Sequence, residues 1–174
     1  MSESSHDAVK LGLASHLTRL WRYGLVLSGS RDTAEDLVQA TCVRALERAH
    51  QFEPGTRLDR WLMTILHRIW LNDLRAARYR RGEGLVDAES ALIFDGARAV
   101  EANISAAQVL RNVQALPEAQ RETVFLVYVE GFTYREAAEA LDVPIGTVMS
   151  RLAAARAKLS ESAGGDPQAR RARS

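Results

Sequence analysis

The segment that constrains the fold of this chain most strongly covers residues 133–159. Thr133 and Glu136 have the spacing of a capping box, in which each side chain hydrogen-bonds the backbone N–H of the other residue, so a helix should begin at Tyr134. Asp142 and Pro144 should end this helix, because the residue before a proline avoids helical geometry and proline suits the start of a new helix. The segment therefore predicts two helices joined by a tight corner.

The second helix of this pair has two contrasting sides. Val148, Leu152 and Leu159 fall on one stripe that can pack inward. The opposite side carries hydroxyl, cationic and small side chains that can reach phosphates and base edges: Thr147, Ser150, Arg151, Ala154 and Lys158. No acidic residue occurs between Pro144 and Ser160. This layout predicts a helix-turn-helix, in which one helix braces and the next enters the DNA major groove. The alternative is a plain helical hairpin with a solvated basic face, because such patterns are loose.

Helical periodicity also dominates the rest of the chain, without strand-like alternation of useful length. We expect helices at about 7–27, 32–50, 56–80 and 105–115, and a further helix from Pro117 to near Gly131. Start signals for the second and third helices are the pairs Asp32 with Glu35 and Thr56 with Asp59. The sequence thus predicts an all-α fold of two small helical domains, residues 7–81 and 103–161, the second containing the helix-turn-helix. Residues 82–102 should form a linker and residues 162–174 a disordered tail.

A second candidate nucleic-acid site lies on the arginine-rich third helix. Residues 57–81 contain seven arginines and two acidic residues, and the interleaved aromatic residues are Trp61, Trp70 and Tyr79. This combination is typical of single-stranded nucleic-acid binding, because cations follow the backbone and rings stack on unpaired bases. Trp61 fits the core equally well, whereas Trp70 lies off the apolar stripe and is the better candidate for stacking or for an interface. A run of arginines at a helix end can also simply favour the helix dipole.

Composition argues against several other classes of protein. The net charge of +1 is too small for the whole chain to bind nucleic acid by charge alone. A single cysteine, Cys42, allows no internal disulfide; a buried, inert thiol in a reducing cytoplasm is expected. The four histidines have no partner at ligand spacing, so no metal is assigned. No nucleophile–base group or phosphate loop indicates an enzyme or a cofactor, and no apolar run is long enough for membrane insertion.

Several motifs resemble those of a known family. Residues 32–41 (DTAEDLVQAT), Phe52, residues 61–65 (WLMTI) and Arg75 resemble region two of bacterial sigma factors. Residues 116–121 (LPEAQR), 131–138 (GFTYREAA) and 144–151 (PIGTVMSR) resemble region four. With only these two regions, over roughly residues 10–160, the chain resembles the extracytoplasmic-function (group IV) sigma factors of the sigma-70 family. The resemblance implies a specificity subunit that brings core RNA polymerase to a promoter and opens the duplex, and it implies an anti-sigma partner.

The resemblance also implies roles for individual residues. One set would bind the clamp of core polymerase: Asp36, Gln39, Ala40, Val43 and Arg44. A second set would hold the melted minus-ten element: Phe52, Gly55, Arg57, Arg60, His67, Arg68, Asn72, Arg75 and Arg78. A third set would read the duplex minus-thirty-five element: Thr133, Gly146, Thr147, Met149, Ser150, Arg151, Ala154 and Arg156. The linker would thread toward the polymerase active centre.

The chain departs from the family pattern at four positions. Arg68 replaces a usual asparagine, and Asn72 stands at a frequently acidic position. Met149 and Ala154 stand where many members carry arginine or another polar residue, which predicts fewer charged contacts and more apolar contact with thymine methyl groups. Two other functions remain open at this point: a stand-alone helix-turn-helix regulator, which would leave the first eighty residues unexplained, and a helical adaptor that binds only protein.

Overall fold

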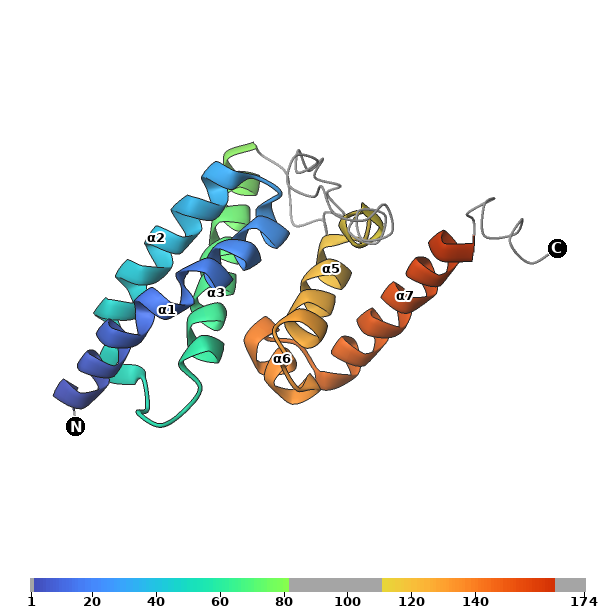
Figure 1. Ribbon diagram of the computed structural model, residues 1–174. Helices are drawn as coiled ribbons and strands as arrows, with labels where there is room; N and C mark the ends of the chain where they lie inside the picture. The colour runs from blue at the N-terminus through green and yellow to red at the C-terminus, as the bar shows by residue number, and fades with distance from the viewer. Residues whose placement is uncertain (1, 82–110, 165–174) are drawn as a thin grey trace. The chain divides into compact units, whose positions relative to one another are not determined.

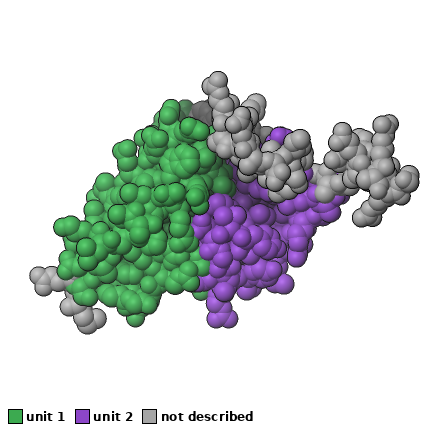
Figure 2. Space-filling view, viewed as in Figure 1, with its two compact units in different colours: residues 1–88, 139–142 green, residues 89–138, 143–174 purple. Residues whose placement is uncertain are grey.

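The computed structural model describes residues 2–81 and 111–164. These two ranges contain helices and no strand, so the predicted all-α fold is confirmed. The helices belong to two compact units, which Figure 2 colours separately. The first unit contains α1 to α3, and the second contains α5, η2, the start of α6, and α7. The predicted linker, most of the predicted 105–115 helix and the end of the tail lie outside the described residues.

The first unit is built from α1 (Ser2–Ser28), α2 (Arg31–Glu47), the short 3-10 helix η1 (Ala49–Gln51) and α3 (Leu58–Arg81) (Figure 1). Helix α1 begins five residues before the predicted start, at Ser2 instead of Asp7. Large side chains from all three long helices form the core: Leu20, Tyr23, Leu27, Leu37, Leu62, Met63 and Leu66 are almost fully buried. Burial of these side chains supplies the main driving force that holds the three helices together.

A glycine lets α1 and α2 cross closely. A Cβ atom added to Gly24 would lie 3.1 Å from the Cα atom of Ala34, so a larger residue would push the two helices apart. The following turn is closed by Ser28, whose hydroxyl donates to the carbonyl of Gly24 at 2.8 Å. Ser30, not the predicted Asp32, caps α2, because its hydroxyl accepts a hydrogen bond from the N–H of Thr33. The N-cap therefore lies two residues before the predicted one, and the helix begins at Arg31.

The second unit contains α5 (Glu118–Val124), the π-helix η2 (Phe125–Val129), the start of α6 (Tyr134–Leu141) and α7 (Ile145–Gly164). Helices α5 and η2 are continuous in sequence and correspond to the single helix predicted after Pro117. The π-type turn is closed by a 3.0 Å hydrogen bond from the N–H of Glu130 to the carbonyl of Phe125. Gly131 then adopts a φ of +68°, a left-handed conformation that glycine reaches without strain, and the chain leaves the helix as predicted.

Within the described ranges, none of the helices combines the length and apolar character required to cross a bilayer.

Candidate interfaces for nucleic acid and polymerase

The hydrogen bonds and backbone angles at the corner between α6 and α7 are consistent with the predicted helix-turn-helix. The N–H of Thr133 donates to the Glu136 carboxylate at 2.7 Å, and the N–H of Glu136 donates to the Thr133 hydroxyl at 3.2 Å. This pair of bonds confirms the capping box. Asp142 ends the corner with a φ of +53°, a left-handed conformation that aspartate tolerates better than most residues. The carbonyl of Pro144 then accepts the first N–H bonds of α7.

Helix α7 buries one stripe and exposes another. Val148, Leu152 and Ala155 are fully buried, so two of the three predicted inward residues lie in the core and Leu159 is half-buried. Five of the residues predicted to read duplex DNA on this helix are exposed: Gly146, Met149, Ser150, Ala154 and Arg156. Thr133 is exposed just before α6, whereas Thr147 is half-buried. Most of the predicted set therefore shares one accessible side of α7.

Arg151 is the exception on this helix. The sequence places it on the outer side, but its guanidinium is half-buried and Nη1 lies 3.4 Å from Oε1 of Glu122 on α5. In the free chain a carboxyl group of the neighbouring helix thus contacts the Arg151 side chain, and its role in reading bases stays a prediction. Nothing in the sequence spacing indicates this pairing, since the two residues are 29 positions apart.

Glu122 is a buried acid at the centre of the second unit. Burial raises the pKa of Glu122 to about 8, and the charge of Arg151 only partly opposes that effect; Glu118 raises the pKa further, and Arg121 lowers it. Arg121 is itself buried and donates from Nη1 to the backbone carbonyls of Gln114 at 3.1 Å and Leu116 at 3.2 Å. These two side chains tie the start of α5 to the chain before it and to α7.

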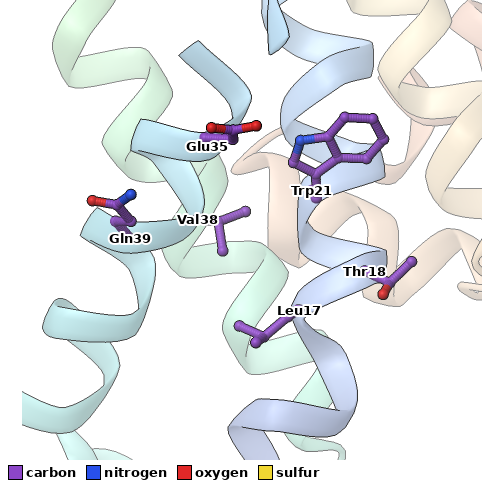
Figure 3. Close-up of a pocket in the computed structure, with 6 residues that line it drawn as sticks. All are labelled: Leu17, Thr18, Trp21, Glu35, Val38 and Gln39. Atoms are coloured by element: carbon purple, nitrogen blue, oxygen red, sulfur yellow. The ribbon is translucent and has the colours of Figure 1, made fainter. Parts of the chain in front are cut away.

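The residues predicted to bind polymerase form a continuous exposed stripe on α2. Asp36, Gln39, Ala40, Val43 and Arg44 recur at intervals of three and four residues, which places them on one helix face, and all five are exposed. Val43 gives this stripe an apolar centre because 57% of its surface is accessible. An open groove of about 350 Å³ adjoins the stripe, lined by Leu17, Thr18 and Trp21 of α1 and by Glu35, Val38 and Gln39 of α2 (Figure 3).

The predicted minus-ten residues divide into an exposed row and a buried group. Arg68, Asn72 and Arg75 recur along one exposed side of α3, and Arg75 Nη1 donates to Asn72 Oδ1 at 3.4 Å. Tyr79 extends the row and is 89% exposed. Trp70, which the sequence favours for stacking, is 7% exposed and belongs to the core. Tyr79, not Trp70, is therefore the most exposed of the aromatic side chains interleaved with these arginines.

Phe52 and His67 are the buried members of the predicted set. The Phe52 ring contacts the half-buried Trp61 ring with centroids 5.3 Å apart at 48°. His67 Nδ1 lies 3.4 Å from the buried Tyr23 hydroxyl of α1. Packing within the first unit covers both side chains in the free chain, and their contact with DNA stays a prediction. Gly55 remains exposed between them, with a φ of +92° that suits glycine, and Arg78 is half-buried.

Asp59 is a further functional candidate, although its position in the sequence indicates only a helix start. Its carboxylate accepts two hydrogen bonds from Arg57, at 3.1 and 3.0 Å, and lies 3.3 Å from Arg60 and 3.2 Å from Arg19. The Thr56 hydroxyl, expected to cap α3, donates instead to the carbonyl of Glu53. The neighbouring arginines at 57 and 60 were a signal for this cluster, but the contribution of Arg19 from α1 required the fold.

The arginines around Asp59 also set its protonation. Burial alone would raise the pKa of Asp59, but the hydrogen bond from Arg57 and the charges of Arg60, Arg57 and Arg19 outweigh burial and lower the pKa to about 2. The ionised carboxylate in turn holds Arg57 and Arg60, both predicted DNA contacts, in fixed positions next to the exposed loop at Gly55.

The single cysteine, Cys42, lies on α2 and is half-buried, whereas the sequence predicted that it would be buried. Partial burial raises the pKa of its thiol.

The fold and these surfaces define a helical DNA-binding protein with a sigma-70 organisation. Residues 13–80 match the family Sigma-70 region 2, and residues 106–159 match Sigma-70, region 4. The sequence is 34% identical over 154 residues to the ECF RNA polymerase sigma factor EcfG of Rhodopseudomonas palustris (strain TIE-1), covering 88% of this chain and 84% of EcfG. The chain belongs to the extracytoplasmic-function RNA polymerase sigma factors, and it is therefore an alternative sigma factor, a transcription initiation factor.

Two solved structures are similar over most of the chain. One is the sigma factor RpoE in complex with the anti-sigma factor NepR from Bartonella quintana, with 32% identity, a TM-score of 0.72, and coverage of 90% of this chain and 97% of that one. The other is CnrH in complex with the cytosolic domain of CnrY, with 25% identity, a TM-score of 0.64, and coverage of 95% and 96%.

Proposed function

We propose that this sigma factor directs polymerase to a promoter through three surfaces. The exposed stripe on α2 binds core RNA polymerase, the exposed row on α3 binds the melted minus-ten strand, and the exposed side of α7 binds the minus-thirty-five duplex. The observation that carries the proposal is that one chain presents an arginine-and-tyrosine row on α3 and a helix-turn-helix with an accessible second helix, in the order of the two family regions.

The chemistry of the α3 row suits an open DNA strand. Extruding a base from the duplex costs a few kcal/mol, which binding must offset. Stacking of one base on an aromatic side chain such as Tyr79 contributes about 1–3 kcal/mol, and cations such as Arg68 and Arg75 follow the phosphates. The Asp59 cluster fixes Arg57 before DNA arrives, so less side-chain freedom is lost on binding. The row can thus favour the open strand over the closed duplex.

The α2 stripe suits a protein partner better than DNA. It combines an apolar centre at Val43 with one anionic residue, one cationic residue and an amide, Asp36, Arg44 and Gln39, which is the mixture found in transient protein interfaces. The adjacent groove between α1 and α2 offers room for an additional side chain. We propose that an anti-sigma partner controls access to this region, a proposal supported by the similarity of this chain to RpoE, which was solved in complex with the anti-sigma factor NepR. We also propose that the protein acts in the cytoplasm.

Reconstituted transcription with purified bacterial core RNA polymerase tests the proposal. Wild-type protein should support initiation at specific start sites, selected from a fragment library of the source genome. Val43→Asp places a charge at the centre of the α2 stripe and should reduce core binding in a pull-down. The double change Arg68→Ala with Arg75→Ala should leave core binding intact but reduce strand opening.

Arg22→Ala is the matched control, because Arg22 is an exposed arginine on α1 outside all three surfaces. Its transcription should match the wild type. Binding to duplex DNA without polymerase, together with no promoter-specific initiation, would support the stand-alone regulator instead. If Val43→Asp binds core polymerase as tightly as wild type, the assignment of the α2 stripe is wrong.

A further inference from the structure

The exposed side of α7 presents no charged side chain over its first turns. Between Pro144 and Ala155 the sequence has one charged residue, Arg151, and that residue contacts Glu122 of α5. Two rows with the four-residue spacing of a helix face run along the exposed side. One row is Ile145, Met149 and Ala153, and the other is Gly146, Ser150 and Ala154. The next exposed cation on this helix is Arg156.

Ile145 and Met149 are the two large side chains in this region. Ile145 is 48% exposed and Met149 is 53% exposed, so about half of each apolar side chain faces solvent. The remaining members of both rows are small, and a Cβ atom added to Gly146 would meet nothing within 4 Å. Because the neighbours of these two apolar side chains are small, this surface of α7 can approach the floor of a DNA groove closely without a steric clash.

Base readout depends on which groups the first turns of such a helix present. Residues at the N-terminal end of a recognition helix contact base edges in the major groove. Guanine is read mainly by arginine or lysine, whereas the 5-methyl group of thymine is read by apolar contact. The described contacts leave Met149 and Ile145 pointing to solvent and engage Arg151 with α5. The available chemistry therefore favours methyl groups over the acceptor pair of guanine.

We propose that Met149, flanked by Ile145, reads thymine methyl groups in the duplex element bound by α7, a specificity that rests on the proposed function of that helix. Ser150 lies in the neighbouring row and supplies a hydroxyl oxygen that can accept from an adenine or cytosine amino group. Its hydroxyl hydrogen is already donated to the carbonyl of Thr147 at 3.0 Å. Arg156 then contacts a phosphate at the edge of the element, and specificity comes mainly from the two apolar side chains.

The test begins with the complete protein bound to core RNA polymerase. The holoenzyme selects duplexes from a library randomised over the upstream element, and each thymine of the selected duplex is then replaced by deoxyuridine, which lacks only the methyl group. At least one replacement should weaken wild-type binding about fourfold, the equivalent of burying one methyl group at about 0.8 kcal/mol. The variant Met149→Ala should bind the thymine duplex about fourfold more weakly and lose its sensitivity to that replacement.

Two variants sharpen the comparison. Met149→Leu retains an apolar side chain and should retain sensitivity to the methyl group. Leu11→Ala removes a side chain that is 81% exposed on α1, away from α7 in sequence, and should behave as wild type. Because Met149 and Leu11 are both exposed, neither change should prevent folding. Thermodynamic coupling between the methyl group and Met149 is then read from the double-mutant cycle.

The possible failures are distinct. A holoenzyme that selects no upstream sequence would contradict the proposed function of α7 itself. A holoenzyme that selects a sequence, but binds thymine and deoxyuridine duplexes equally, would overturn the methyl readout and leave that function standing. Equal sensitivity of wild type and Met149→Ala would also overturn it, because another group would then read the methyl. If Met149→Ala lowers core binding without changing DNA selection, the apolar pair is a protein contact and the inference is wrong.

Discussion

The buried Glu122 makes the stability of the second unit depend on pH in an unusual direction. Burial raises the pKa of this carboxyl from 4.5 to about 8 in the folded protein. A group whose pKa is raised by folding binds its proton more tightly in the folded state, so its contribution to stability is complete below pH 4.5 and is lost as the pH rises toward 8. The full change corresponds to an upper limit of about 5 kcal/mol.

Replacing Glu122 by glutamine keeps the size of the side chain and removes its ionisation. We expect Glu122→Gln and wild type to have similar free energies of unfolding at pH 4.5, because the wild-type carboxyl is then neutral in the folded state. At pH 9 the glutamine variant should be the more stable of the two, by up to about 5 kcal/mol, because the raised pKa already includes the opposing charge of Arg151. Between pH 4.5 and pH 9 the stability advantage of the glutamine variant should grow by at most about 1.4 kcal/mol per pH unit.

Urea unfolding of the full chain at pH 4.5, 6, 7.5 and 9 measures this difference, with fluorescence and circular dichroism as parallel probes. Glu161→Gln is the matched control, since Glu161 is an exposed glutamate on α7 and should show a flat difference from wild type. If Glu122→Gln is less stable than wild type at pH 9, the carboxylate is ionised and its ion pair with Arg151 outweighs burial. If the difference in free energy of unfolding between wild type and Glu122→Gln does not vary with pH, folding does not raise the pKa of Glu122 and the prediction is wrong.

Three further outcomes follow from the first unit and its row on α3. Gly24→Ala should destabilise the chain by about 1–3 kcal/mol, because the new Cβ meets the α2 backbone, whereas Gly146→Ala should not, since its Cβ meets open space; thermal unfolding compares them. Asp59→Asn should cost about 1–2 kcal/mol at pH 7, allowing for solvent screening, and this cost should shrink as the pH falls from 4 toward 2, because the lowered pKa stabilises only above it. Arg75→Ala with Arg78→Ala should slow promoter opening more than duplex binding, measured by permanganate reactivity of thymines; equal opening would contradict a role for these side chains in holding the open strand.

The sequence predicted the helices well because each carries its own local signals. The capping box at Thr133, the breaks at Gly29 and Gly131 and the proline at 144 depend on neighbours within a few residues, and the structure places a helix boundary near each of them. The exposed stripe on α2 follows from the same kind of information, since helical spacing alone decides which residues share a face. The family could also be predicted from the sequence, because the motifs of region two and region four occur along the chain in that order.

The sequence could not predict contacts made between helices. By helical spacing Trp70 lies off the apolar stripe of α3, yet the packing of the unit covers it, and His67 packs against Tyr23, 44 residues earlier. Similarly, Arg151 looks like an outward cation until Glu122 is placed beside it. In each case a helical wheel gives the direction of a side chain but not what the next helix puts there, so burial and pairing had to come from the fold.

The π-type turn of η2 has a consequence for how this chain can vary. A turn closed by a bond from Glu130 to Phe125 accommodates one residue more than an α-helical turn between the same ends. Removing one residue from 125–129 would restore ordinary α-helical winding between the same two ends, whereas removing one residue from an α-helical stretch such as α5 would rotate everything after it by about 100° about the helix axis. A one-residue deletion within η2 should therefore disturb the second unit less than the same deletion within α5 or α6.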